Sequence, residues 1–172
     1  MIPDLFWITG PWRGRLAISA RPRGGDWLED EVRGWRSAQV DSVVSLLERD
    51  EEKQLELDKE GEVAEASGIH FISFPIVDRG VPTSIPSTIS LLRSVNRALE
   101  QGENVAVHCR QGIGRAALFA AGALMAAGKS PEAVSSARGV NVPETQEQRE
   151  WLQKRSGQIT GHVPPGNGPS IS

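Results

Sequence analysis

The sequence predicts an α/β fold in which a mostly parallel central sheet is flanked by helices. Short apolar runs alternate with amphipathic helical stretches, an order typical of β-α units that build parallel sheets. The runs Val43–Leu47 and Val105–Val107 resemble strands that are buried on both faces. The length, 172 residues, fits one domain with a single sizeable core. We expect that domain to span residues 1–156, and the Gly/Pro/Ser-rich residues 157–172 to form a disordered tail.

The first half of the chain predicts strands and two helices. Two short strands form a hairpin around a Gly/Pro turn, and a helix follows with Asp26 as its N-cap and Trp27 on its inner face. After the buried strand, a charge-dense stretch leads into a second helix that ends at Gly68. Pro75 indicates that the next strand lies at an edge of the sheet or ends there. The expected ranges are Leu5–Ile8, Leu16–Ser19, 26–38, Val43–Leu47, Glu60–Ser67 and Ile69–Ile76.

Helices dominate the second half of the chain. An amphipathic helix begins within Ser84–Ser87 and places Leu92 and Leu99 inward. The helix after the next strand is so rich in alanine and leucine that it must be buried. Ser130 and Thr145 are the N-cap candidates of the last two helices. The expected ranges are a helix over 87–101, a central strand over Val105–His108, and helices over 115–127, 130–138 and 145–156.

Composition and charge argue against several classes of function. The net charge of −3 gives no support for nucleic-acid binding, and no apolar run is long enough to span a bilayer. The segment Met1–Asp4 does not resemble the start of a signal peptide, and a single cysteine cannot form an intrachain disulfide. We therefore expect a cytoplasmic protein without a membrane partner, for which nucleic acid is a disfavoured ligand.

The segment Val105–Arg115 carries the most specific functional pattern. Its strand leads to Cys109, and Gly112 and Gly114 let the following loop curl so that successive N–H groups point into one concavity. The N-terminus of the next helix adds free donors and a positive dipole, a setting that favours a thiolate. Arg115, separated from Cys109 by five residues, can clasp two phosphate oxygens. The pattern predicts a thiolate aimed at a bound phosphate, sulfate or vanadate.

Other uses of this cysteine fit the residues less well. A redox site lacks a second cysteine, and one cysteine with three scattered histidines does not make a zinc ligand set. A nucleotide P-loop needs Gly-Lys-Ser/Thr, whereas this chain has Gly114-Arg115-Ala116. A buried cysteine that acts only as a small hydrophobe is the plainer alternative. We expect no cofactor and no metal.

The pattern His108-Cys109-x5-Arg115 resembles the signature loop of the protein tyrosine phosphatase superfamily, in particular the small dual-specificity, atypical bacterial type. The resemblance covers roughly residues 4–155 and implies an α/β sandwich of the cysteine-phosphatase kind. It also implies metal-independent hydrolysis of phosphomonoesters through a phosphocysteine intermediate, with Cys109 as the nucleophile. The short length and the absence of tyrosine favour the shallower dual-specificity type. The resemblance assigns phosphate binding to Arg110, Gln111, Gly112, Ile113, Gly114 and Arg115.

The resemblance also assigns roles outside this loop. Asp78, on a Gly/Pro-bounded loop after a strand, matches the general acid that protonates the leaving oxygen, although a solvated aspartate in a turn is the plainer alternative. His108 would hydrogen-bond the loop backbone and support the thiolate. Gln148, with Glu144 as a second candidate, would position the hydrolytic water. The pattern Thr145-x-x-Gln148 is also that of a capping box.

One residue departs from the family pattern. The position after the signature arginine usually carries Ser or Thr, whose hydroxyl stabilises the departing thiolate, and here it is Ala116. We therefore expect the second chemical step to be slow.

The substrate is less defined than the chemistry. A phosphorylated protein is the leading candidate, and phosphoinositides, other small phosphomonoesters and RNA 5′-phosphates remain open. A phosphate-binding pseudophosphatase is the alternative function. A thiol-based arsenate reductase or sulfur transferase is disfavoured, because it needs further cysteines or a different loop.

Overall fold

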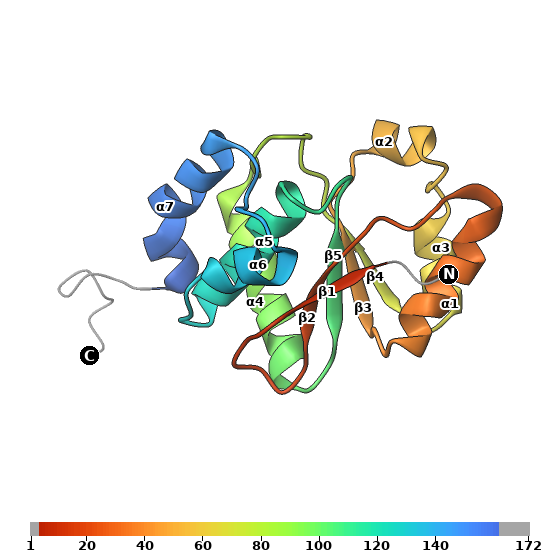
Figure 1. The fold of residues 1–172 in the computed structure, drawn as a ribbon, viewed down its shortest axis with the longest axis horizontal. Coiled ribbons are helices and arrows are strands. Elements are labelled where there is room, and N and C mark those ends of the chain that lie inside the picture. Colours follow the sequence, from red (N-terminus) through yellow and green to blue (C-terminus); the bar gives the residue numbers. More distant parts are fainter. Residues whose placement is uncertain (1–3, 162–172) are drawn as a thin grey trace.

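A computed structural model describes residues 4–161, and one five-stranded sheet forms its centre (Figure 1). The strands are β1 (Leu5–Ile8), β2 (Leu16–Ser19), β3 (Ser42–Ser45), β4 (His70–Ser73) and β5 (Val105–His108). Their order in the sheet is β1-β2-β5-β3-β4, which puts β5 in the middle and β4 at an edge. Only the β1–β2 pair among these strands is antiparallel, so the expected mostly parallel sheet is confirmed.

Helices lie on both sides of this sheet (Figure 1). On one side are the 3-10 turn η1 (Gly25–Trp27), α1 (Leu28–Ser37), α2 (Arg49–Gln54) and α3 (Glu60–Ala66). On the other are α4 (Ile85–Glu100), α5 (Arg115–Ala126), α6 (Glu132–Arg138) and α7 (Gln146–Thr160). Helix α5 packs against α4, α6 and α7 and also against β2 and β5. Within residues 4–161, no helix combines the length and apolarity needed to cross a membrane.

The two layers of helices bury two separate hydrophobic cores. Because successive side chains of a strand point to opposite faces, β3 and β5 contribute to both cores. Val44 and Val107 pack on the α5 side, whereas Val43 and Ala106 pack on the side of α1 and α3. The residues of α5 from Arg115 to Leu124 are all buried, which confirms the expected burial of this alanine-rich helix.

Some expected boundaries are wrong. Asp26 does not cap a helix, because residues 25–27 form a 3-10 turn ahead of α1, and Trp27 is 55% exposed rather than inward. The charge-dense stretch contains helix α2, which was not expected. The last helix continues through Gly157 and ends at Thr160, and it is capped by Gly161, whose φ of 69° is favourable for glycine. The other expected tail residues, 162–172, lie outside the described residues.

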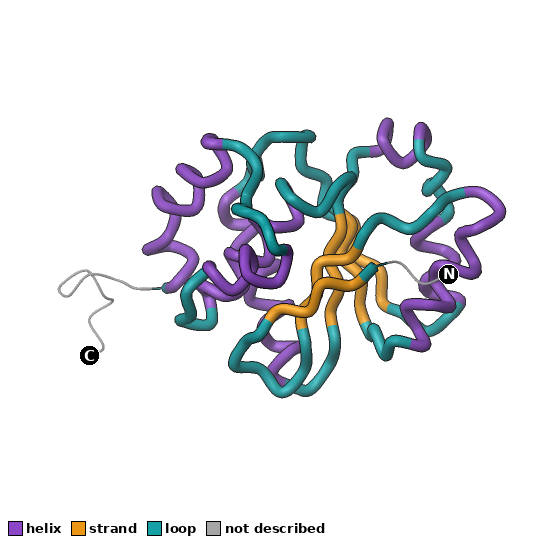
Figure 2. Tube along the Cα trace, viewed as in Figure 1, coloured by secondary structure: helices purple, strands orange, loops and turns teal. Residues whose placement is uncertain are grey.

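The parallel strands bring four loops to one edge of the sheet. Because β2, β5, β3 and β4 run in the same direction, the loops after them leave at their shared carboxyl end (Figure 2). The loop after β5 is central, and those after β2 and β3 flank it. Residues from distant parts of the sequence therefore meet around Cys109.

Candidate active site

The loop after β5 surrounds the cysteine with backbone. Cys109 is 3% exposed, and the backbone N–H of Gly112 donates a hydrogen bond to its Sγ at 3.2 Å. Gly112 has a φ of 78°, and a Cβ at this position would lie 3.1 Å from Cγ2 of Ile18. Both the positive φ and the close neighbour favour glycine here. The loop backbone thus donates directly to the sulfur.

The side chain of Arg115 is fixed from several directions by Glu51 and by two backbone carbonyls. Its Nη1 donates to Oε1 of Glu51 at 2.6 Å and to the carbonyls of Ile76 at 2.8 Å and Leu46 at 3.3 Å. Its Nη2 donates to Oε2 of Glu51 at 2.8 Å and lies 3.1 Å from Oδ1 of Asp78. The two bonds to Glu51 form a bidentate pair, which fixes the plane of the guanidinium.

This pair changes the pKa of both partners. Burial acts to raise the pKa of Glu51, but hydrogen bonds from Arg115 and from the N–H of Glu48 outweigh it and lower that pKa below 4.5. Burial acts to lower the pKa of Arg115, but the hydrogen bond to Glu51 and the charge of Cys109 raise it overall. Both groups are therefore charged near neutral pH, although Arg115 is only 1% exposed.

A small pocket opens over the cysteine. It has a volume of about 110 Å³ and brings together the three residues predicted for catalysis, Cys109, Arg115 and Asp78. Arg79, Gln111, Gly114 and Glu144 complete its lining. The side chain of Asp78 is 55% exposed and lies on the loop after β4. The pocket has room for a group about as large as phosphate.

The other loop residues are arranged unequally around this pocket. Gln111 is exposed and lines the pocket. Gly114 is buried and also lines it. Arg110 does not line it, because its guanidinium turns toward α2, with Nη1 3.9 Å from Oε2 of Glu51 and 3.5 Å from Oε1 of Gln54. Ile113 is partly buried and is also absent from the lining. For Arg110 and Ile113, therefore, the backbone N–H groups remain candidates for phosphate binding, but the side chains do not.

His108 lies beneath the loop and is fully buried. Its Nδ1 is 3.4 Å from the carbonyl oxygen of Cys109, a weak form of the expected contact with the loop backbone. Its shorter contact joins Nε2 to Oε2 of Glu60 at 2.6 Å, and its ring stacks on Trp35 with centroids 5.9 Å apart. The other carboxylate oxygen of Glu60 is buried and has no hydrogen-bond partner among residues 4–161. The His108–Glu60 pair thus fixes the last residue of β5 before the nucleophile.

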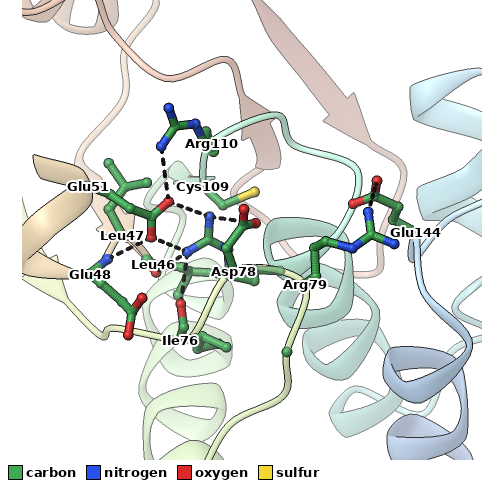
Figure 3. A network of polar contacts seen from close by, with 12 residues as sticks. Leu46, Leu47, Glu48, Glu51, Ile76, Asp78, Arg79, Cys109, Arg110 and Glu144 are labelled. Carbon is green, nitrogen blue, oxygen red and sulfur yellow. Dashed lines mark hydrogen bonds and ion pairs between the residues drawn. The ribbon is translucent and has the colours of Figure 1, made fainter. Parts of the chain in front are cut away.

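The start of α7 holds the loop that carries Asp78. Gln148 is fully buried, and its Nε2 donates to the carbonyl of Gly80 at 3.0 Å while its Oε1 accepts from the N–H of Thr145 at 3.1 Å. Glu144 and Arg79 form an ion pair at 2.8 Å (Figure 3). The expected capping box of Thr145 and Gln148 is therefore present. Both amide atoms of Gln148 are engaged with protein groups in this structure.

Gln148 also lies next to the phosphate loop. A Cβ placed on Gly114 would come within 3.2 Å of Nε2 of Gln148. This proximity fits a role near the reacting group, but that role requires the amide to leave one of its present partners.

Two buried acidic residues of the site were missed from the sequence. Glu51 and Glu60 lie in the charge-dense stretch. Glu51 contacts Arg115 and Glu60 contacts His108, which are both residues of the central motif. The chain contains 22 acidic residues, and no local pattern distinguishes these two from solvated ones. Their partners are distant in the sequence, so only the fold brings them together.

Known structures share this architecture. Kinase associated phosphatase with its catalytic-site cysteine replaced by serine is 19% identical, over 95% of this chain and 99% of that chain, with a TM-score of 0.82. Tk-PTP in its active form is 28% identical over 87% of this chain and 94% of its own, with a TM-score of 0.66. PTPMT1 in complex with PI(5)P is 20% identical over 90% and 97%, with a TM-score of 0.68. None of the curated proteins matches the chain.

A family model gives the assignment at the level of sequence. The model described as "Tc-R-P: Polymorphic toxin system, DSP-PTPase phosphatase" matches residues 19–129. This span includes Asp78 and the whole loop from Cys109 to Arg115. The chain belongs to this family of DSP-PTPase phosphatases, within the superfamily of dual-specificity and tyrosine phosphatases.

Proposed function

We propose that the protein hydrolyses phosphomonoesters through a phosphocysteine intermediate and without a metal ion. The observation that carries this proposal is the pocket of about 110 Å³ lined by Cys109, Arg115 and Asp78. It combines a nucleophile, a cation and a carboxylic acid around a space that fits phosphate. Backbone N–H groups and Arg115 supply the charge stabilisation that a metal ion supplies elsewhere.

In the first step, the phosphate group binds between the loop N–H groups and Arg115. In the structure, Nη2 of Arg115 lies 3.1 Å from Oδ1 of Asp78. When substrate binds, this Nη2 contacts a phosphate oxygen in place of Asp78. The Cys109 thiolate attacks phosphorus in line, so that an S–P bond forms as the bond to the leaving oxygen breaks. Asp78, in its protonated form, donates its proton to that oxygen.

In the second step, water hydrolyses the phosphocysteine. Its oxygen attacks phosphorus, the S–P bond breaks, and the electron pair returns to sulfur as the thiolate. The Asp78 carboxylate accepts the proton of the water, which restores the acid for the next cycle. Gln148 positions the water once the Nε2 contact with Gly80 opens. Ala116 offers no hydroxyl to the departing thiolate, so this step limits turnover.

We propose phosphorylated proteins as the substrates. Phosphotyrosine is the first candidate for the residue that is dephosphorylated, and phosphoserine or phosphothreonine is the second. The likeness to Tk-PTP and to kinase associated phosphatase supports this class. The complex of PTPMT1 with PI(5)P favours phosphoinositides as the second candidate. Against it, the only cation between Cys109 and Arg115 is Arg110, and its side chain points to α2 rather than into the pocket.

The test is the hydrolysis of p-nitrophenyl phosphate in EDTA, with and without vanadate. We expect activity in the wild type that vanadate inhibits and that Cys109→Ser abolishes. Activity that EDTA removes, or that survives in Cys109→Ser, would contradict the proposal.

A phosphate-binding pseudophosphatase is the second candidate function, favoured by the missing hydroxyl at Ala116. Its expected result is an inactive wild type whose melting temperature still rises when vanadate binds.

A further inference from the structure

A second and larger hollow adjoins the pocket over Cys109. Its volume is about 660 Å³, and Gln111 lines both hollows, so that they are neighbours at this residue. We call it the arginine groove, because three arginines line it. The lining residues used below are Arg21, Arg23, Arg110, Trp27, Glu56 and Gln111.

The topology of the sheet explains why this groove lies beside the cysteine. Strands β2 and β5 are parallel neighbours, so the loop after β2 leaves the sheet next to the loop after β5. Nη1 of Arg21 donates to the carbonyl of Arg110 at 2.8 Å and joins the two loops. The opposite wall is the end of α2, which approaches so closely that a Cβ on Gly24 would lie 2.1 Å from the carbonyl oxygen of Leu55.

The groove is positively charged although the whole chain is acidic. Three guanidinium groups line it, and the side chains of Arg23 and Arg110 are 39% and 37% exposed. Among the described residues, Glu56 is the one carboxylate in the lining, and it is exposed. Within residues 4–161, no carboxylate pairs with Arg21. The charge of Arg21 is therefore available to an anionic group in this groove, whereas Arg23 already pairs with Glu31 and Arg110 lies 3.9 Å from Glu51.

Arg23 is held in a fixed orientation. Its guanidinium stacks over the ring of Trp27, 4.3 Å from the centroid, and its Nε pairs with Glu31, whose side chain is 4% exposed. Stacking and pairing reduce the rotamer freedom that binding would otherwise remove. Trp27 is 55% exposed, so its ring also adds an accessible apolar wall. The groove thus has the features of a binding site rather than of a solvated surface.

We propose that the arginine groove binds acidic residues that flank the phosphorylated residue of a peptide substrate. This inference rests on the proposed function and adds a substrate preference to it. The pocket of about 110 Å³ holds little beyond the phosphate group, so the rest of the substrate lies in the adjoining space. An extended peptide advances about 3.3 Å per residue, so residues on one side of the phosphorylated residue are within reach of the groove past Gln111. Carboxylates there match the planar guanidinium groups.

The surroundings favour a peptide over the surface of an anionic membrane. Flat binding to such a surface needs a broad basic face. Here the turn that carries Trp27 also carries the exposed Asp26, and α1 continues with the exposed Glu29 and Asp30. A bilayer in contact with Trp27 would meet these carboxylates, whereas none of the three lines the groove that a peptide would enter.

The experiment measures the ratio of kcat/KM for two phosphotyrosine peptides that differ only in flanking Glu or Ala residues. Because each variant serves as its own reference, a general loss of activity cancels in the ratio. We expect a wild-type ratio of roughly three to ten, as a few partly exposed ion pairs provide, which falls as the salt rises from about 50 mM to about 500 mM. Arg21→Gln and Arg23→Gln should each lower the ratio by about twofold to fivefold.

Two further variants test the sign and the position of the effect. Glu56→Gln removes the carboxylate of the groove and should raise the ratio. Arg33→Gln removes a cation of α1 that is paired with Asp30 at 3.1 Å and lies outside the groove, and it should leave the ratio unchanged. Arg23→Gln leaves Glu31 buried without its partner and can therefore destabilise the fold. Arg21→Gln is included because it tests the groove without breaking that ion pair.

The outcomes separate this inference from the proposed function. A wild type that does not hydrolyse p-nitrophenyl phosphate refutes the proposed function, and the inference falls with it. A wild type that hydrolyses p-nitrophenyl phosphate and both peptides with a ratio near one refutes the inference alone. The same holds if Arg33→Gln lowers the ratio as much as Arg23→Gln. Binding to vesicles with anionic lipids that Arg21→Gln and Arg23→Gln abolish, without a peptide preference, would assign the groove to a lipid surface instead.

Discussion

Replacing Glu51 with glutamine tests whether the buried partner of Arg115 controls both stability and activity. In the wild type the two carboxylate oxygens of Glu51 accept bonds of 2.6 and 2.8 Å from Arg115. Glutamine keeps one acceptor but points an NH₂ group at the guanidinium. The variant therefore removes one charge-assisted bond and leaves a buried cation without its bidentate partner.

The burial of the pair sets the size of the effect. Arg115 is 1% exposed and the side chain of Glu51 is 9% exposed, and removing one partner of a buried pair costs about 3–5 kcal/mol. Arg115 keeps the carbonyls of Leu46 and Ile76 and the nearby Asp78, so we expect a smaller loss than this range, about 2–3 kcal/mol. For a chain of this length, such a loss lowers the melting temperature by roughly 4–12 °C.

Activity should fall because the guanidinium loses its alignment. A displacement of about 1 Å in a catalytic group lowers the rate by about 100-fold, so we expect kcat/KM for p-nitrophenyl phosphate to fall by about 10-fold to 100-fold.

The difference in stability between the wild type and Glu51→Gln also depends on pH. The pKa of Glu51 is lowered in the folded protein, so its contribution is present above the unfolded value near 4.5 and is lost as the pH falls through the folded value.

The assay combines urea unfolding and steady-state kinetics at neutral pH with unfolding at acidic pH. Asp50→Asn is the matched control, because Asp50 is an exposed neighbour on the same helix and should change the stability by less than about 1 kcal/mol. The reasoning is refuted if Glu51→Gln unfolds and turns over like the wild type. It is also refuted if the two proteins differ in stability by the same amount well below pH 4.5 as at pH 7.

Three further predictions concern the acid, the second step and the last helix. Asp78→Asn should lower kcat by about 10²–10⁴-fold for phenyl phosphate but less for p-nitrophenyl phosphate, and equal losses would argue against a general acid. Ala116→Ser should raise turnover and remove a pre-steady-state burst of p-nitrophenol; unchanged turnover and no wild-type burst would contradict this step order. Gln148→Ala should lower the stability to urea by about 1–2 kcal/mol and speed hydrogen exchange around Gly80, which it now contacts, and unaltered exchange would speak against that tether.

The sequence was sufficient for those features that depend on local patterns. Consecutive apolar residues identified the buried strands, and alternation of strands and helices predicted a mostly parallel sheet, which is confirmed. The loop from Cys109 to Arg115 could be recognised because its residues are contiguous. Thr145 and Gln148 also form the expected capping box, since a cap is defined within one turn.

Features that depend on tertiary contacts could not be predicted in the same way. Glu51 and Glu60 are buried only because α2 and α3 pack against the motif, and their own segment reads as a solvated, charged stretch. Trp27 was expected inside because it would share one face of a helix with Val32 and Trp35, yet residues 25–27 form a 3-10 turn that leaves it 55% exposed beside the arginine groove. Arg110 lies within the motif, but its contacts with α2 turn it away from the pocket.

The tether between α7 and the loop of Asp78 bears on how this protein can be dissected. The family match ends at residue 129, but Glu144 and Gln148 contact the loop from beyond that point. A fragment cut to the matched region would keep Cys109, Arg115 and Asp78 and lose the helix that orders their neighbours. We therefore expect that a fragment that keeps the wild-type activity must include α7, which ends at Thr160.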